Sequence, residues 1–368
     1  MLHTRVVTGS GGGPDKTILN SPRFLADEYD MVCAYMRPNG YPGFAELTRR
    51  GEAKGATVLG IDDDGALDIG VIRRFRDLCR SIKPDIWHGH DYKSNLLGLL
   101  LRRHHPMHLI TTVHGWVTRD WKLPIYYAVD RACLKRYDRV VAVSPDLHAA
   151  SIKAGVKPER CTYLPNGVDT EDFRRRTAIE DAKAAQFGAP RERIVFGAAG
   201  RLSGEKGFHF LIRAFAAVRK EIDALLWIAG EGPQRAELLA LIRELGLESS
   251  VKLLGFQSDV RPLYEGTDVF MLSSLREGIP NVVLEAMAYG LPIVSTPIAG
   301  LSELIEDGKT GRLVTAGEVA PLSNAMLELA RAPETRQAFG AHARTCVETR
   351  FSFRNRMEGM RQVYHSLR

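Results

Sequence analysis

The sequence predicts an α/β protein of two doubly wound domains, each a parallel sheet covered by helices on both faces. The chain has 368 residues, which is too long for one ordinary core and suits two domains of about 150–200 residues each. Short β-branched runs alternate with amphipathic segments along the whole length, which is the order typical of parallel sheets. Residues 174–193 are charged, rich in alanine and without a strand pattern, so the sequence breaks there.

The elements follow one another in a regular order in both halves. Apolar residues recur at helical spacing between the strands, as Leu211, Phe215 and Val218 do within 210–219. The strands expected in the first half are 5–8, 31–35, 57–61, 85–88, 109–113 and 139–143. Those expected in the second half are 194–198, 225–229, 251–254, 268–272, 292–295 and 311–314.

Composition excludes several classes of protein. Hydrophobic residues make up 45% and charged residues 26%, which is the balance of a globular protein rather than a disordered one. The longest aliphatic run, near 96–101, is far shorter than the roughly 20 residues of a membrane-spanning helix. The five cysteines are widely spaced without a Cys-x-x-Cys pair, which argues against disulfides and thiolate metal sites. The N-terminus has no signal-peptide pattern, so we expect a cytoplasmic protein.

The net charge of +6 suits an anionic partner. A nucleotide substrate, an anionic membrane surface and nucleic acid would all use such a charge. Aromatic residues are not interleaved with a basic run, so we expect no nucleic-acid partner. Peripheral association with the inner face of a membrane stays open, as does the oligomeric state.

The first candidate loop is glycine-rich and follows the first expected strand. Residues 9–13 read Gly-Ser-Gly-Gly-Gly and are followed by Lys16. Glycine lets the backbone approach a phosphate, and the N-terminus of the next helix favours anions. The loop is not a P-loop, because Asp15 stands before the lysine where that motif needs glycine. A phosphate-binding loop and a simple tight turn both remain open on these residues.

The second candidate loop carries two cations. Residues 200–207 read Gly-Arg-Leu-Ser-Gly-Glu-Lys-Gly, between an expected strand and a helix. Arg201 and Lys206 are thereby held at a helix N-terminus, where two cations can clamp a diphosphate. Exposed cations on a loop are more often solvated, and it is the next motif that favours binding.

That motif contains two glutamates. Glu277 lies in the loop before an expected helix, and Glu285 lies inside the helix, roughly 7–8 Å further along the axis. Carboxylates suit sugar hydroxyls, and the first-turn N–H groups of Asn281 and Val282 have no intrahelical partner. Two hydroxyl-bearing rings with a phosphate between them would fit this arrangement.

Taken together, these motifs resemble the retaining GT-B glycosyltransferases that use nucleotide-diphospho-sugars and carry a Glu-x7-Glu signature (family 4-like, group 1). The resemblance covers nearly the whole chain, and the number and order of its motifs make it specific. They are Gly12-Gly13, Thr112-Val113-His114-Gly115-Trp116, Val143-Ser144, Pro165-Asn166-Gly167-Val168-Asp169, Gly200-Arg201, Glu205-Lys206-Gly207, Gly230-Glu231-Gly232-Pro233, Gly255-Phe256 and 277–290.

The resemblance implies a role for each motif. Arg201 and Lys206 would neutralise the donor diphosphate, Glu277 would bind the donor sugar and Glu285 the ribose. His114 would lie against the sugar and its reacting carbon. The other implied donor contacts are Gly12, Gly13, Phe256, Gln257, Gly278, Ile279, Asn281 and Val282. The resemblance also implies an acceptor-binding domain at 1–170, a donor-binding domain at 171–350 facing a common cleft, and a C-terminal helix, 351–368, returning to the first domain.

The implied mechanism needs no protein nucleophile, cofactor or metal. A donor phosphate oxygen would take the acceptor's proton while the acceptor attacks from the leaving-group face, which retains the anomeric configuration. Catalysis would then rest on positioning and on stabilising the diphosphate charge. The acidic run 62–64 lies away from every donor motif and is interpreted as a solvated turn, and no His/Cys cluster is apparent in the sequence.

The substrates are less well defined. His90, Asp91, Lys93 and Lys16 are the expected acceptor-binding residues, for a sugar, lipid-linked or other small acceptor. The run 278–281 resembles polysaccharide-assembly members and favours a UDP-sugar, with a hexosyl or N-acetylhexosaminyl group transferred. Alternative functions are a sugar-nucleotide epimerase or hydrolase on the same fold. An NAD-dependent oxidoreductase is less favoured because no acidic residue ends the second strand.

Overall fold

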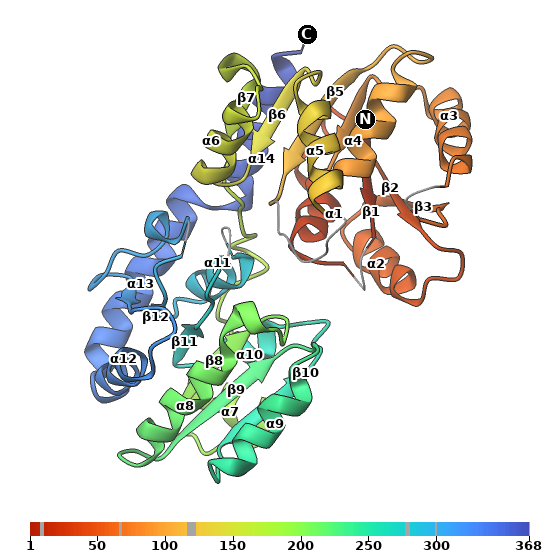
Figure 1. Ribbon diagram of the computed structural model, residues 1–368. Coiled ribbons are helices and arrows are strands. Elements are labelled where there is room, and N and C mark those ends of the chain that lie inside the picture. Colours follow the sequence, from red (N-terminus) through yellow and green to blue (C-terminus); the bar gives the residue numbers. More distant parts are fainter. Residues whose placement is uncertain (8–10, 66–67, 116–122, 277–279, 299, 368) are drawn as a thin grey trace. The chain divides into compact units, whose positions relative to one another are not determined.

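A computed structural model describes residues 1–7, 11–65, 68–115, 123–276, 280–298 and 300–367 (Figure 1). Residue 8 of the expected strand 5–8 lies outside the described residues, and the order of elements is otherwise the predicted α/β alternation. The chain divides into two compact units, Met1–Asn166 with Arg354–Arg368, and Gly167–Phe353. Each unit is described by itself below.

The first unit is built on a seven-stranded parallel sheet in the order β3-β2-β1-β4-β5-β6-β7. Its strands are β1 Leu2–Val6, β2 Val32–Arg37, β3 Thr57–Asp62, β4 Ile86–Gly89, β5 His108–Val113, β6 Arg139–Ala142 and β7 Cys161–Tyr163. Its helices are α1 Gly13–Leu25, α2 Pro42–Glu52, α3 Gly70–Ile82, α4 Tyr92–Leu101, α5 Leu123–Leu134, α6 Pro145–Lys153 and α14 Phe353–His365.

The second unit is built on a six-stranded parallel sheet in the order β10-β9-β8-β11-β12-β13. Its strands are β8 Ile194–Ala199, β9 Ala224–Ala229, β10 Val251–Gly255, β11 Val269–Leu272, β12 Ile293–Ser295 and β13 Gly311–Leu313. Its helices are α7 Ile179–Phe187, α8 Phe208–Arg219, α9 Arg235–Glu244, α10 Arg261–Glu265, α11 Asn281–Ala288, α12 Val319–Arg331 and α13 Pro333–Arg350.

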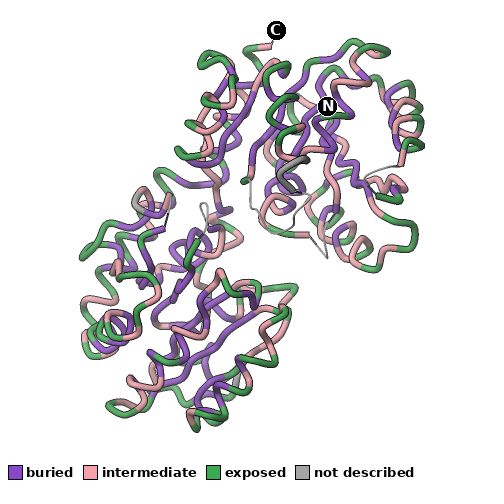
Figure 2. The backbone as a smooth tube through the Cα atoms, viewed as in Figure 1, coloured by how far each residue is buried: buried purple, intermediate pink, exposed green. Residues whose placement is uncertain are grey.

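The central strands of each sheet are buried on both faces, as Figure 2 shows in purple. In the second unit one cluster of apolar side chains, including Trp227 and Phe270, fills one face. Another, including Phe196 and Phe215, fills the other face. This two-sided burial explains why the strands read as nearly continuous apolar runs.

One strand prediction needs correction, and one strand was missed. β1 is Leu2–Val6 rather than 5–8, because its buried residues include the polar His3 and Thr4, which hide the strand pattern. β7, Cys161–Tyr163, was not predicted; three residues at a sheet edge give too short a pattern to recognise.

The C-terminal helix α14 belongs to the first unit. Arg361 forms an ion pair with Asp27 at 3.2 Å, and buried Arg356 donates to the carbonyl oxygen of Leu164 at 2.7 Å. The Tyr364 hydroxyl lies 2.9 Å from Nδ1 of His88. The last helix therefore reaches the centre of the first sheet. In the described part of the chain, no helix has the length and apolar character to cross a bilayer.

Candidate active site

The strand order places a ligand-binding position in each unit. In open parallel sheets, ligands bind beyond the carboxyl ends of the strands where the strand order reverses. That point lies between β1 and β4 in the first unit and between β8 and β11 in the second. The predicted Gly-Arg…Glu-Lys-Gly loop follows β8 and the glutamate motif follows β11, so both belong to the same edge.

Hydrogen bonds join these two loops directly. The backbone N–H of Leu275 donates to the carbonyl oxygen of Glu205 at 2.7 Å. The Ser273 hydroxyl donates to the carbonyl oxygen of Lys206 at 2.9 Å. Lys206 ends the short 3₁₀ turn Gly204–Lys206, and Arg201 is exposed. The backbone that carries the two cations is thus fastened to the end of β11.

Two glycines allow this close approach. Gly207 has φ +63°, and a Cβ there would lie 2.2 Å from the carbonyl oxygen of Ser273. Gly230, after β9, has φ +141°, and a Cβ there would lie 1.8 Å from the carbonyl oxygen of Gly200. Both positions combine a left-handed backbone with contact to another backbone, so only glycine fits.

The helix α11 begins at this edge. Asn281 and Val282, in its first turn, are partly exposed. Glu285 is only 2% exposed, and its Oε2 accepts a hydrogen bond from the Tyr264 hydroxyl at 2.8 Å. Burial, together with the Glu285 carboxylate, raises the pKa of Tyr264 well above its usual value. Tyr264 therefore remains a hydrogen-bond donor that orients Glu285.

The end of β10 contributes an exposed aromatic ring. Phe256, directly after the strand, is 55% exposed, while Nε2 of Gln257 donates to the carbonyl oxygen of Leu254 at 2.8 Å. An exposed phenyl ring at this edge offers an apolar face on which a planar ring can stack.

In the first unit, the glycine-rich loop ends in a tightly bonded helix start. The buried carboxylate of Asp15 accepts from the N–H of Gly12 at 2.6 Å and pairs with Arg5 at 3.0 Å. Gly12 is exposed, and Gly13 and Lys16 are partly exposed. The aspartate that rules out a P-loop thus holds this loop in place.

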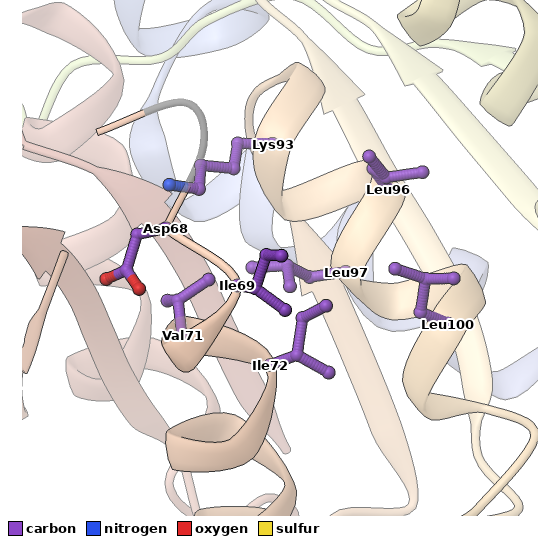
Figure 3. Close-up of a pocket in the computed structure, with 8 residues that line it drawn as sticks. All are labelled: Asp68, Ile69, Val71, Ile72, Lys93, Leu96, Leu97 and Leu100. Carbon is purple, nitrogen blue, oxygen red and sulfur yellow. The ribbon is translucent and has the colours of Figure 1, made fainter. Parts of the chain in front are cut away.

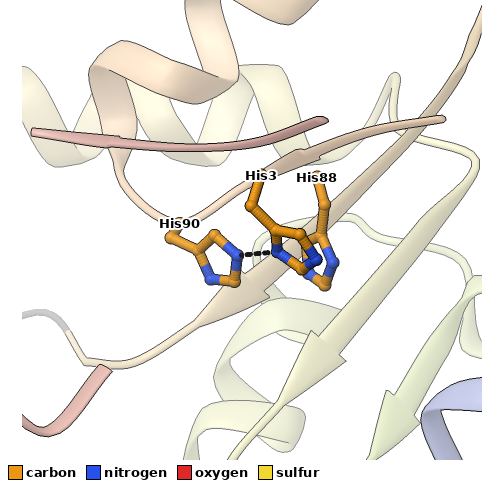
Figure 4. A group of neighbouring side chains, drawn as sticks. All are labelled: His3, His88 and His90. Atoms are coloured by element: carbon orange, nitrogen blue, oxygen red, sulfur yellow. Dashed lines mark hydrogen bonds between the residues drawn. The ribbon is translucent and has the colours of Figure 1, made fainter. Parts of the chain in front are cut away.

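Four histidines gather at the switch point of the first unit, where Figure 4 shows three of them. Nδ1 of His3 lies 2.9 Å from Nε2 of His90, and Nδ1 of His90 lies 3.1 Å from Nε2 of His114. His88 stacks on His90 with ring centroids 4.4 Å apart. Its own Nε2 lies 2.8 Å from the Thr112 hydroxyl oxygen. Neighbouring strands β1, β4 and β5 thus bring the imidazoles into one row.

Burial keeps this row neutral. Desolvation lowers the pKa of His3 to about 3 and lowers the pKa of His88, His90 and His114 well below the usual value. For His114, the charges of Arg5 and Arg356 act in the same direction. His3, His88 and His90 also have nitrogens close enough to suggest a metal site, although nearby guanidinium groups disfavour a cation there.

The expected acceptor residues have structural partners. Asp91 caps α4 by accepting from the N–H of Ser94 at 2.8 Å, and it also accepts from the N–H of Val6 at 2.6 Å. Lys93 is 8% exposed and pairs with buried Asp63 at 2.5 Å. The interpretation of residues 62–64 as a solvated turn is therefore wrong for Asp63, which lies in the interior opposite a lysine 30 residues away.

An apolar groove lies between the start of α3 and α4 (Figure 3). Its volume is about 450 Å³, and its rim includes Ile69, which is 78% exposed. The remaining lining residues are Asp68, Val71, Ile72, Lys93, Leu96, Leu97 and Leu100. The lining of the groove is mostly apolar, apart from Asp68 and Lys93.

Comparison with known families identifies the chain. The model named "Glycosyltransferase Family 4" matches residues 12–172, and the model named "Glycosyl transferases group 1" matches residues 193–332. The chain is a group 1, family-4-like glycosyltransferase. The two matches fall on the two parallel-sheet units in turn, and the predicted family is confirmed, while retention of configuration stays a prediction.

Relatives and solved structures agree with this family. The glycosyltransferase is 28% identical over 311 residues to the putative glycosyltransferase EpsD of Bacillus subtilis, covering 81% of this chain and 80% of EpsD. It is 28% identical to an Escherichia coli UDP-Gal:α-D-GlcNAc-diphosphoundecaprenol α-1,3-galactosyltransferase, covering 68% of each. The structure of Anabaena HepE in complex with UDP superposes with a TM-score of 0.85 at 21% identity over 99% of both chains. The predicted GT-B fold is thereby confirmed.

The structure of the glycosyltransferase gathers part of the predicted donor set. Arg201, Lys206, Asn281 and Glu285 lie on elements of one sheet edge. Glu277, Gly278 and Ile279 fall outside the described residues. The roles of all these residues, and those of Gly12, Gly13 and His114, remain predictions.

Sequence reasoning missed three buried partners. Tyr264 holds Glu285, Asp63 holds Lys93, and His3 extends the histidine row. No local signal singled out His3, because its strand Leu2–Val6 also contains the polar residues Thr4 and Arg5. The other two pairings left no local pattern.

Acid should destabilise the glycosyltransferase through its buried histidines. Their folded-state pKa values lie below the usual 6.5, so the unfolded state binds more protons as the pH falls below about 6.5. Stability is then lost progressively, by up to about 1.4 kcal/mol per pH unit for each group; for His3 the loss continues to its folded pKa of about 3. Urea unfolding of wild type and His3→Phe across this range measures the effect. The variant should show the shallower pH dependence, and equal slopes would contradict the prediction.

Proposed function

We propose that this glycosyltransferase transfers a hexosyl or N-acetylhexosaminyl group from a UDP-sugar to a sugar or lipid-linked acceptor in polysaccharide or glycolipid assembly. We further propose that it retains the anomeric configuration and requires no metal or cofactor. The observation that carries the donor assignment is the fastening of the Arg201–Lys206 loop to the end of β11. Those two hydrogen bonds hold the backbone that carries both cations against the end of β11, the strand that precedes α11.

The chemistry of this edge suits a nucleoside diphosphate. As the sugar leaves, negative charge grows on the diphosphate, and preorganised cations and the positive end of the α11 dipole stabilise it without reorganising. Glu285, held by Tyr264, offers a carboxylate oxygen to a ribose hydroxyl. Phe256 offers a ring face to the base.

Two named proteins support the choice of substrates. HepE was solved with UDP, and the E. coli relative is named for a UDP-galactose donor and a diphosphoundecaprenol-linked acceptor. The proposed retention follows from a site in which the donor phosphate itself accepts the proton of the attacking hydroxyl. Paired cations take the charge-neutralising role that a metal has in other transferases.

Nucleotide binding tests the donor assignment. UDP at about 100 times its Kd should stabilise the protein by about 2.7 kcal/mol, and it should do so equally with EDTA present. ADP, GDP and NAD serve as matched ligands in the same thermal-shift series. Stabilisation by NAD but not by UDP would favour the oxidoreductase alternative, and a UDP effect that EDTA abolishes would contradict metal independence.

Transfer must then be separated from hydrolysis. With a panel of UDP-sugars, product analysis by NMR should show an α-linked product from an α-linked donor when an acceptor is present. Free sugar alone, with any acceptor, would favour a hydrolase, and an isomerised UDP-sugar would favour an epimerase.

A further inference from the structure

The histidine row has a direction. Three of its members, His3, His90 and His114, are joined end to end by two hydrogen bonds of 2.9 Å and 3.1 Å. Burial lowers the pKa of all three, so each ring is neutral at pH 7 and has one N–H. Because His90 has a single proton to donate, both bonds must point the same way along the row.

The environment of His3, at the buried end of the row, determines the direction of the two hydrogen bonds. Nε2 of His3 is buried and has no hydrogen-bond partner in the described part of the chain. If His90 donates to His3, the proton of His3 lies on this nitrogen. If His3 donates to His90, this nitrogen has only a lone pair. A buried N–H without an acceptor is the rarer arrangement. The proton of His3 therefore belongs on Nδ1, from which it points to His90.

We propose that His3 and His90 are positioning residues that hold His114 in the tautomer protonated at Nδ1. His3 donates to His90, His90 donates to Nε2 of His114, and the remaining proton of His114 lies on Nδ1. The described residues show no hydrogen bond to this Nδ1. This inference rests on the proposed function and on the predicted role of His114 against the donor sugar.

The surroundings support a fixed neutral donor rather than a base. The groups facing the three bonded histidines are Arg5 and the N-terminal ammonium from the β1 side, the fourth histidine, His88, from β4, and Arg356 and Tyr364 from α14. Arg5 and Arg356 oppose protonation of His114, and no carboxylate among them favours it. A neutral imidazole with its N–H aimed at substrate can donate a hydrogen bond to a sugar oxygen, and it leaves proton removal to another group.

His3 is the position at which to test this, since it lies two rings from His114. His3→Phe keeps a buried ring but removes the donor to His90. We expect a loss of about tenfold or more in kcat, with UDP affinity and donor KM changed less than about twofold, because the diphosphate site lies in the other unit. His3→Asn, whose amide nitrogen takes the place of Nδ1, should recover most of the rate. Thr112→Val is the matched control, because it removes a buried hydrogen bond from His88 and leaves the two bonds that join His3, His90 and His114.

The tautomer itself is measured by two-bond ¹H–¹⁵N NMR of ¹⁵N-histidine-labelled protein, with His114 assigned by substitution. Wild type should show His114 protonated at Nδ1, and His3→Phe should show the Nε2-protonated form appearing. A wild-type His114 protonated at Nε2 overturns the proposal, as does His3→Phe with normal kcat, or Thr112→Val with an equal loss.

Two further outcomes separate the proposal from its alternatives. A stoichiometric transition metal in the purified protein, lost in His3→Phe, would mean that the rings are metal ligands, and the proposal would fail. Absence of UDP binding would refute the proposed function. The NMR result would still decide the direction of the row in that case.

Discussion

Arg201→Ala should lower turnover by about 10²–10³-fold, as removal of other preorganised electrostatic contacts does. Arg201 lies exposed on the loop between β8 and α8, and the backbone beside it is fixed to the end of β11 through Glu205 and Lys206. In the proposed function, the diphosphate charge develops beside this guanidinium. Steady-state kinetics with a UDP-sugar measure the loss, and Lys206→Ala should behave similarly.

The controls for this prediction come from the same unit. Arg243→Ala removes an exposed cation in the last turn of α9 and should leave the rate unchanged. Arg201→Lys keeps the charge without the planar fork and should give an intermediate rate. Folding stability should stay within about 0.5 kcal/mol in all three, because the side chains are exposed. Normal turnover in Arg201→Ala would refute the assignment of this loop to the diphosphate.

Asp63→Ala should destabilise the protein by about 3–5 kcal/mol, since it leaves a buried ammonium without its counter-charge. Lys93 is 8% exposed and Asp63 is 4% exposed, and the Lys93 ammonium also donates to the carbonyl oxygen of Gly65 at 2.5 Å. One remaining carbonyl partner is too weak to compensate for the lost carboxylate. Urea unfolding monitored by circular dichroism gives the change in free energy.

A variant of the neighbouring residue and a double variant serve as controls for that experiment. Asp64→Ala changes an exposed residue one position away and should alter stability by less than about 0.5 kcal/mol. Replacing both partners with apolar residues, as in Asp63→Val with Lys93→Met, should recover most of the loss, because no charge is then buried. If Asp63→Ala and Asp64→Ala behave alike, the pair is not buried in solution.

The loops at the carboxyl edge of the second sheet could largely be predicted, because the sequence patterns that indicate them are local. In a parallel sheet the loop after each strand opens at the carboxyl edge, so the positions of Arg201 and Lys206 follow from strand order along the chain. The fastening of their loop to Ser273 could not be predicted, since it depends on β8 and β11 being neighbours in the sheet. The glycines in these loops indicated close backbone contacts but did not identify the residues contacted.

The first unit was harder to predict. His90, Asp91 and Lys93 were expected to line an acceptor site because they follow a strand and begin a helix. In the structure Asp91 caps that helix and Lys93 is paired in the interior. The sequence pattern of a polar residue at a strand end is the same whether its side chain faces a ligand or a buried partner.

The sequence by itself determined the fold class, the glycosyltransferase family and the loops at the carboxyl edge of the second sheet. These depend on burial period, turn residues and motif order, which are properties of neighbouring residues. Only the tertiary structure decided that Asp63 meets Lys93, that Tyr264 holds Glu285, and that His3 joins His90 across 87 positions of the chain. These contacts arise where β1 lies beside β4 and where helices pack on the sheets. Such pairings depend on the packing of the whole core, so no local segment of the sequence determines them.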